Sequence, residues 1–136
     1  EKTNIIFSGS HTWQPFRGYI QLLEDFYKIN KSRFNIFIIY ISEAHAADVW
    51  PIGMSAGTIN YSHKHIEDRI TCAKKMVKTF DLTIPMYCDN MNNEFQNEMA
   101  CWPFRFFVVK KDILVHIGQP EDSSFELDSL MDFINI

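Results

Sequence analysis

Residues 34–41 constrain the fold of this chain more than any other segment, because they form its most apolar stretch. The stretch is rich in β-branched and aromatic residues, which favour strands. Such a run is typical of a central strand that is covered on both faces. With 136 residues, 46% of them hydrophobic, the chain is long enough for one buried core and too short for two. We therefore predict a single domain over residues 1–136.

The rest of the chain alternates predicted helices and strands. Helical spacing of apolar residues predicts helices over residues 15–30 and 66–80, a short helical turn over 93–100, and a last helix with a buried stripe of Leu127, Leu130, Met131 and Ile134. Further strands are predicted over residues 3–8, 83–88, 104–109 and 113–117. This order predicts an α/β fold in which a mixed central sheet carries helices on both faces. The arrangement resembles a thioredoxin-like fold.

Residues 42–62 interrupt the alternation, since they contain glycines and a proline and show no clean period. The segment therefore predicts a long loop. Loops of this length inside compact domains usually carry function, so we expect part of a functional site there.

The charge distribution excludes some partners. The formal net charge is −4, and the lysines and arginines are scattered rather than clustered, so we expect no nucleic-acid partner. No apolar run approaches the roughly 18 to 20 residues of a membrane-spanning helix. The chain begins at Glu1 without a signal-peptide pattern. We expect a soluble domain cut from a longer membrane-anchored or secreted precursor, and the compartment itself stays open.

Three cysteines, Cys72, Cys88 and Cys101, are widely separated and odd in number. This pattern predicts neither a disulfide framework nor a paired redox motif. Free thiols that are buried or half-buried are the simplest interpretation.

Four short segments carry the strongest functional signal in the chain. Residues 9–16 read Gly-Ser-His-Thr-Trp-Gln-Pro-Phe, and residues 40–50 read Tyr-Ile-Ser-Glu-Ala-His-Ala-Ala-Asp-Val-Trp. The first resembles the active-site segment of the iodothyronine deiodinase family, Gly-Ser-Cys-Thr followed by selenocysteine and Pro-Pro-Phe. The second is similar to that family's Tyr-Ile-x-Glu-Ala-His-x-x-Asp-Gly-Trp. Residues 63–69 and 88–91 resemble two further segments of the family.

The resemblance implies a thioredoxin-like fold and also identifies what this chain lacks. In that family a selenolate attacks the iodine of an iodothyronine, and a nearby cysteine and external thiols restore the enzyme. Trp13 occupies the selenocysteine position and His11 the cysteine position. An indole has no ionisable thiol or selenol and cannot act as this nucleophile. We therefore predict a catalytically inactive homologue, a pseudoenzyme, that acts as a binding or interaction module.

Four alternatives stay open. An active thiol-dependent oxidoreductase would use Cys88 or Cys101, and an active deiodinase would use a residue other than the usual one. Trp13 would itself be an artefact if a selenocysteine UGA codon had been read as tryptophan. Because deiodinases pair, the chain could also serve as a homodimeric scaffold.

The resemblance also implies the residues of the site. Glu43, His45 and His63 correspond to family positions for a proton relay and for a polar contact to the iodothyronine phenol. Thr12 and Arg105 complete the implied ligand contacts, Arg105 near the substrate carboxylate. The ligand would be an iodothyronine or another small aromatic molecule. As the alternative, Glu43 and His45 only hydrogen-bond the loop and Arg105 forms an ordinary salt bridge.

The same region of the sequence contains side chains that could bind a metal. Imidazole and carboxylate groups suit zinc, and five such groups are present: His11, Glu43, His45, His63 and His65. They come from three separate segments, and the last two histidines lie on different sides of a predicted helix start. We therefore predict no metal and no cofactor. We also expect Trp13 to lie within one residue of the first helix start, facing the carboxyl ends of the strands.

Overall fold

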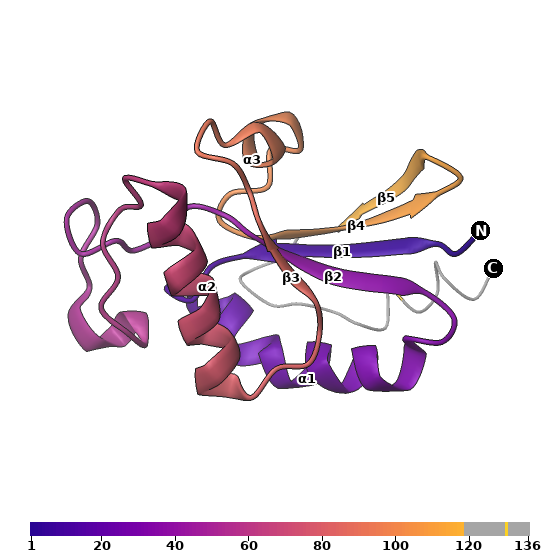
Figure 1. Ribbon diagram of the computed structural model, residues 1–136, viewed down its shortest axis with the longest axis horizontal. Helices are drawn as coiled ribbons and strands as arrows, with labels where there is room; N and C mark the ends of the chain where they lie inside the picture. Colours follow the sequence, from indigo (N-terminus) through magenta and orange to yellow (C-terminus); the bar gives the residue numbers. More distant parts are fainter. Residues whose placement is uncertain (119–129, 131–136) are drawn as a thin grey trace.

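The computed structural model describes residues 1–118 and Leu130. Within this part of the chain, five strands form one sheet in the order β3-β2-β1-β4-β5 (Figure 1). The strands are β1 (Asn4–Gly9), β2 (Asn35–Tyr40), β3 (Met86–Cys88), β4 (Arg105–Lys110) and β5 (Ile113–Gly118). β1, β2 and β3 are parallel, whereas β4 is antiparallel to both of its neighbours. The sheet is therefore mixed, as the sequence predicts.

The helices lie on both faces of the sheet. They are α1 (Gln14–Asn30), the short 3-10 helix η1 (Gly53–Ala56), α2 (Ile66–Phe80) and α3 (Glu94–Glu98). Side chains of α1 and α2 join the main core with alternate residues of β1 and β2. Residues of and beside α3 pack on the opposite face, around Ile41, Cys101 and Phe107. Figure 1 shows α1 below the sheet and α3 above it.

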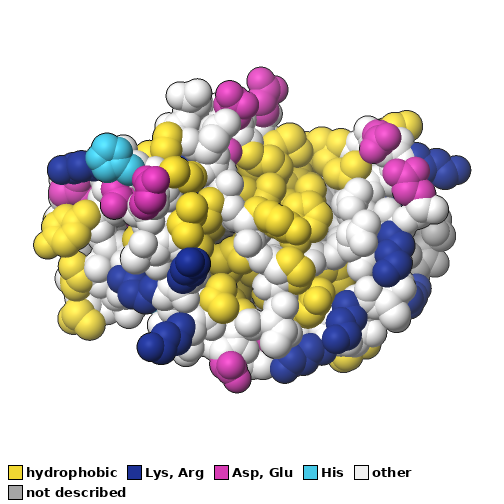
Figure 2. Space-filling model, in the orientation of Figure 1, with side chains coloured by type: hydrophobic (Ala, Val, Ile, Leu, Met, Phe, Trp, Pro, Cys, Tyr) yellow, Lys and Arg dark blue, Asp and Glu magenta, His cyan; other side chains and the backbone are white. Residues whose placement is uncertain are grey.

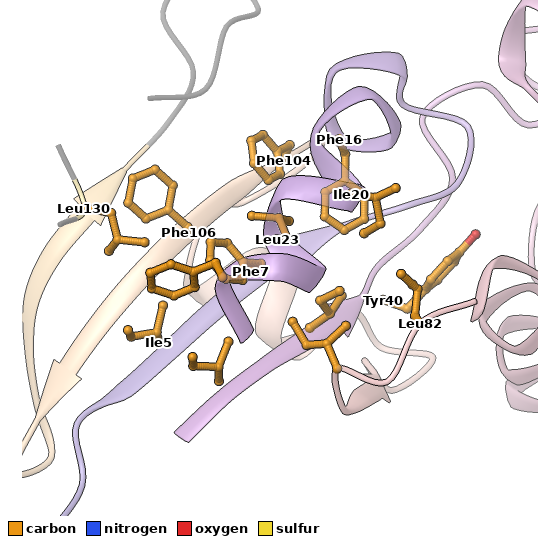
Figure 3. Close-up of a cluster of buried hydrophobic side chains, with 14 of the residues drawn as sticks. Ile5, Phe7, Phe16, Ile20, Leu23, Tyr40, Leu82, Phe104, Phe106 and Leu130 are labelled. Carbon is orange, nitrogen blue, oxygen red and sulfur yellow. The ribbon is translucent and has the colours of Figure 1, made fainter. Parts of the chain in front are cut away.

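The main core holds the start of α1 against the end of β1. Phe16, Ile20 and Leu23 of α1 are buried beside the aromatic side chains of the sheet (Figure 3). A β-carbon at Gly9 would lie 2.6 Å from the ring of Phe16. Glycine is therefore required where β1 ends, because α1 begins so close to it. Leu130 is buried in the same cluster, whereas Leu127, Met131 and Ile134 of the predicted last helix lie outside the described residues.

Most predicted elements are found within one or two residues of their expected bounds, but β3 is shorter than predicted. The backbone N–H groups of Thr83 and Ile84 donate to the carboxylate of Glu24, on α1. Pro85 has no N–H to donate to a sheet. Residues 83 and 84 are therefore bonded to a helix, the carbonyl oxygen of Pro85 accepts the N–H of Ile38, and the strand itself spans only Met86–Cys88. The predicted strand over residues 83–88 is wrong for its first half.

The loop over residues 42–62 contains no strand, as predicted, and its only helical element is η1. Arg17 of α1 donates through its guanidinium to the carbonyl oxygens of Ser55 and Ala56, and also to that of His11. The far end of the loop is fixed by Asp48, whose carboxylate accepts the N–H and the hydroxyl of Ser62 at 2.7 and 3.0 Å. The loop is therefore fastened along its length.

Candidate functional site

Trp13 is the N-cap residue of α1, which confirms the predicted position at the first helix start. Its ring stacks on His45, with ring centroids 6.0 Å apart and an interplanar angle of 19°. His45 follows the carboxyl end of β2, so Trp13 faces that edge of the sheet. The Nε1 atom of Trp13 is buried and has no hydrogen-bond partner among the described residues.

His11 is almost fully buried and is held apart from the other histidines. Its ring contacts Phe80 edge-on, with centroids 5.4 Å apart. Burial lowers the pKa of His11 to about 4, an effect that the charge of Glu43 opposes and that Lys75 and Arg17 reinforce. The imidazole is therefore neutral at neutral pH. It occupies the cysteine position of the family motif as a packed aromatic ring.

Thr12 is buried, and its hydroxyl oxygen accepts the backbone N–H groups of Ala44 and His45 at 3.1 and 3.2 Å. The hydroxyl of Ser10 accepts a further bond from the N–H of Ala44 at 3.3 Å. These bonds fix the beginning of the long loop to the segment before α1. The predicted ligand residue Thr12 thus contributes to loop attachment in this structure.

Glu43 is the centre of a buried polar network. Its carboxylate accepts the hydroxyl proton of Tyr40, with O···O distances of 2.6 and 2.8 Å, and an N–H of Asn60 at 3.0 Å. Burial raises the pKa of Tyr40 well above its ordinary value, and the adjacent charge of Glu43 raises it further. The phenol therefore stays protonated. It also accepts the backbone N–H of His11 at 3.1 Å.

His63 faces the same carboxylate from across the long loop. Its Nε2 lies 3.6 Å from Oε2 of Glu43, and both side chains are nearly inaccessible. Its Nδ1 accepts the Nε–H of Arg69 at 2.9 Å. Because a guanidinium only donates, we infer that the proton of a neutral His63 is on Nε2 and points toward Glu43. At 3.6 Å the two groups are too far apart for a good direct hydrogen bond.

Arg69 fixes the position of His63 through contacts to three segments. The guanidinium is buried, and it also donates to the carbonyl oxygens of Asp89 and Asn90 and to the side-chain oxygen of Asn93. Burial lowers the pKa of Arg69, while the nearby Asp89 carboxylate raises it. This buried arginine thus joins α2 to the segment before α3 and orients His63 toward Glu43.

A pocket of about 290 Å³ opens beside Glu43 and His63. The side chains around it come from the long loop, the start of α2 and the region of α3: Ser42, Glu43, Ala46, Val49, Ser62, His63, Arg69, Met91, Asn93, Gln96 and Trp102. The pocket therefore offers a carboxylate, an imidazole and amides beside apolar groups. Such a set can hold a ligand hydroxyl and move a proton.

The predicted site residues fall into two groups. Glu43 and His63 meet at the pocket, whereas His45 contacts Trp13 and Trp50 and its Nδ1 lies 3.1 Å from the carbonyl oxygen of Trp50. Arg105 is the first residue of β4 and is paired with Ser8 of β1. It therefore lies at the same edge of the sheet as Trp13, which fits the position that the motif implies.

None of the three cysteines lines this pocket. Burial raises the pKa of Cys72 to about 11 and raises the pKa values of Cys88 and Cys101. Cys101 is fully buried. None of the three therefore has the lowered pKa of an activated thiol.

The histidines do not converge on one point. In residues 1–118, the structure shows no group of three or more histidine, cysteine, aspartate or glutamate side chains that could hold a metal. His65 is exposed at the N-cap of α2, and His11 is packed on Phe80. Neither imidazole belongs to a group of this kind.

Sequence reasoning missed three members of the network: Tyr40, Asn60 and Arg69. Two of them were inside motifs, since Tyr40 opens the segment over residues 40–50 and Arg69 ends the segment over residues 63–69. Those positions could have been included. Asn60 carries no comparable signal, because it lies in the aperiodic loop and reaches Glu43 only through the folding of that loop.

The fold is shared with solved thioredoxin-like proteins. A thioredoxin-like protein in the oxidised form superimposes with a TM-score of 0.65 at 13% identity, over 98% of this chain and 78% of that one. A secreted Mycobacterium tuberculosis disulfide oxidoreductase homologous to Escherichia coli DsbE gives a TM-score of 0.64 at 9% identity, over 96% and 78%. The predicted thioredoxin-like fold is thereby confirmed.

The family is shown by sequence. A family model described as iodothyronine deiodinase matches residues 2–135, and the chain belongs to this family. A type I iodothyronine deiodinase of Xenopus laevis is 29% identical over 119 residues, covering 85% of this chain and 44% of that protein. The human type II enzyme is 25% identical over 136 residues, covering 96% and 49%.

The chain spans about half the length of the curated relatives that it matches. In the part that the structure describes, none of the helices combines the length and the apolar character that crossing a membrane requires.

Proposed function

We propose that this chain is a catalytically inactive member of the deiodinase family that binds an iodothyronine or another small aromatic ligand. The observation that supports this most strongly is the position of Trp13 at the N-cap of α1. A helix N-terminus stabilises an anion and lowers the pKa of a thiol placed there. The indole of Trp13 is neutral, so the helix N-terminus does not stabilise a charge on it, and it supplies no nucleophile.

The cysteines do not compensate for this loss. The thiol-dependent alternative requires a reactive cysteine at the pocket with a lowered pKa. Cys88 and Cys101 instead have raised pKa values and are absent from the pocket lining. This favours the inactive homologue over the thiol-dependent oxidoreductase.

The polar network supports a retained binding function. The Nε2–H of His63 is buried without a hydrogen-bond partner in the described structure, 3.6 Å from Glu43. A ligand hydroxyl in the pocket, beside both groups rather than between them, would accept from the Nε2–H of His63 and donate to Glu43, which gives the unpaired His63 donor an acceptor. The volume of about 290 Å³ is at the lower end of the range for small-molecule sites. It suits a single phenolic ring, with the rest of a larger ligand outside.

The test has a catalytic arm and a binding arm. The purified protein is incubated with thyroxine or reverse triiodothyronine and dithiothreitol, and released iodide is measured against a heat-killed control. We expect no release above the control. Calorimetry with the same compounds should show binding that weakens in a His63→Phe variant and persists in Lys28→Gln, a change at an exposed residue of α1.

Each arm has an outcome that contradicts the proposal. Thiol-dependent iodide release would contradict the proposed inactivity. Loss of that release after alkylation of the protein would assign the reaction to a cysteine. Absence of binding by any iodothyronine or simple phenol would leave the network as a purely structural feature and reject the binding function.

A further inference from the structure

A second, apolar groove lies between α2 and the edge strand β3. One face of α2 supplies side chains at helical spacing, and β3 supplies two more from its α2-facing side: Ile66, Ile70, Ala73, Val77, Met86 and Cys88. The groove has a volume of about 470 Å³. Figure 2 shows hydrophobic side chains across the middle of the visible face, with lysine and arginine side chains bordering them on the α2 side.

The charged groups at this groove are of one sign. Lys74 and Lys78 line it, and the lining includes no aspartate or glutamate. The chain as a whole carries 17 acidic and 13 basic residues, whereas the two charged residues that line the groove are both lysines. Lysine stems cover apolar surface while their ammonium groups stay in water. An apolar trough with such a border is complementary to an amphiphile that has an anionic head group.

The dimensions of the groove favour a slender ligand that lies inside it over a peptide that would rest on it with one face. The lined stretch of α2 runs from Ile66 to Lys78, about 18 Å at the rise of an α-helix. A partner helix about 10 Å across and of that length would need about 1,400 Å³, three times the volume present. An added strand would find only the three residues of β3 to pair with, whereas stable strand addition draws its affinity from main-chain hydrogen bonds.

We propose that the groove binds a long-chain fatty acid. The acyl chain lies along Ile66, Ile70, Ala73 and Val77, and the carboxylate is held by Lys74 and Lys78. Burial of methylene groups drives binding, and the lysines orient the chain and select an anionic head. The groove shares no lining residue with the pocket of Glu43 and His63, so this site is independent of the function proposed above.

Cys88 provides a reporter inside the groove. Oleate is titrated below the concentration at which it forms micelles, by calorimetry, and the alkylation rate of each cysteine is followed by peptide mass spectrometry. We expect saturable binding of one oleate per chain and at least a fivefold slower alkylation of Cys88. Cys72 and Cys101 lie outside this lining, and their alkylation rates should not change.

Variants identify the head-group and chain contacts. Lys74→Glu with Lys78→Glu should weaken oleate binding at least tenfold, and Ile70→Asn should weaken both oleate and the uncharged oleyl alcohol. Lys28→Glu, an exposed change on α1, is the matched control and should leave binding intact. Circular dichroism checks that each variant is folded. If the double lysine variant is not folded, the milder Lys74→Gln takes its place.

Four results would overturn the proposal, the first three of which concern oleate alone. These are binding that does not saturate, binding that is indifferent to the lysine and Ile70 changes, and alkylation of Cys88 that oleate leaves unchanged. Equal affinity for oleate and oleyl alcohol would also overturn it, because the lysines would then select no head group.

Discussion

At the scale of single residues, the site differs from its family motif at positions that the structure keeps ordered. Trp13 stacks on His45, and His11 packs on Phe80. Each replacement is therefore a packed aromatic ring in a place where the motif has a chalcogen. Around them, Tyr40, Glu43 and His63 keep a connected polar network.

Returning a thiol to the helix start should restore an activated nucleophile without restoring turnover. We expect the thiol of Trp13→Cys to be alkylated at a lower pH than an ordinary cysteine, whose pKa is about 8.5, because the start of α1 stabilises the thiolate. Little deiodination should follow, since His11 and Gln14 also depart from the family motif. Peptide-resolved labelling with iodoacetamide from pH 5 to 9 measures this.

Trp13→Ser is the control for the labelling, because it opens the same space without adding a thiol. A new cysteine that alkylates with the pH profile of a free thiol would contradict the expectation. It would indicate that the helix start no longer acts on the residue at this position.

The buried His11 should make the protein less stable in mild acid. An unfolded histidine has a pKa of about 6.5, whereas burial lowers that of folded His11 to about 4. Between these two pH values, His11 therefore binds a proton in the unfolded chain and not in the folded chain. Stability is fully present above pH 6.5 and is lost as the pH falls toward 4, by about 3 kcal/mol.

Urea unfolding at pH 7 and pH 4.5 measures this loss, and His11→Phe supplies the comparison. The variant keeps a ring against Phe80 but has no proton to gain, so its stability should depend less on pH than that of the unchanged protein. Equal pH dependence in the two proteins would assign the loss to other groups.

At the scale of elements, local periodicity predicted the helices well, and tertiary hydrogen bonds decided what it missed. The apolar spacing over residues 66–80 matches α2 to the residue. The first half of the predicted strand over residues 83–88 is not a strand in the structure. The carboxylate of Glu24, 59 positions away from Thr83, accepts the backbone N–H of Thr83 instead. No window of sequence contains both partners, so local pattern could not reveal this contact.

The sequence likewise predicted where the main residues of the site lie but not the hydrogen bonds between them. Glu43, His63 and Trp13 could be placed because motifs and strand ends locate them at one edge of the sheet. The tautomer of His63, the role of Arg69 and the bond from Asn60 depend on how the long loop returns to α2. These are consequences of three-dimensional packing rather than of spacing.

Glu24 should therefore stabilise the connection between α1 and β3. Glu24→Ala would leave the N–H groups of Thr83 and Ile84 without their acceptor, which should cost about 2 to 4 kcal/mol of unfolding free energy. Glu24→Gln keeps one acceptor oxygen and should cost less. Asp25→Ala, on the exposed side of the same helix, should have little effect. Chemical denaturation with urea distinguishes the three, and similar losses for Ala at both positions would contradict this role.

At the scale of the whole molecule, the described sheet ends in two different edges. β3 is short and lies beside the proposed fatty-acid groove, whereas β5 is six residues long and exposes several apolar side chains: Ile113, Leu114, Val115 and Ile117. A long apolar edge strand is a template for pairing with another chain. This supports the homodimer as a proposal.

We expect the protein to associate into dimers through β5. Sedimentation analysis over a range of concentrations should show a dimer for the unchanged protein. Ile117→Lys should shift it toward monomer, because a charge on the edge disfavours strand pairing. Ile29→Lys places the same change on α1, where the side chain is 77% exposed, and should leave the dimer intact. A monomer at every concentration would reject the dimer.

The hydrogen bonds that hold the long loop give the motif over residues 40–50 a structural role that is separate from catalysis. Tyr40 and Asn60 bond to Glu43, Thr12 holds the loop start, and Asp48 holds Ser62. Each of these bonds contributes to folding whether or not a substrate ever arrives. These contacts would therefore stabilise residues 40–50 in an active deiodinase and equally in the inactive homologue proposed above. Under the proposed inactivity, a search that scores that segment would find folded relatives with or without a nucleophile, and the residue at the N-cap of α1 would be the position to compare.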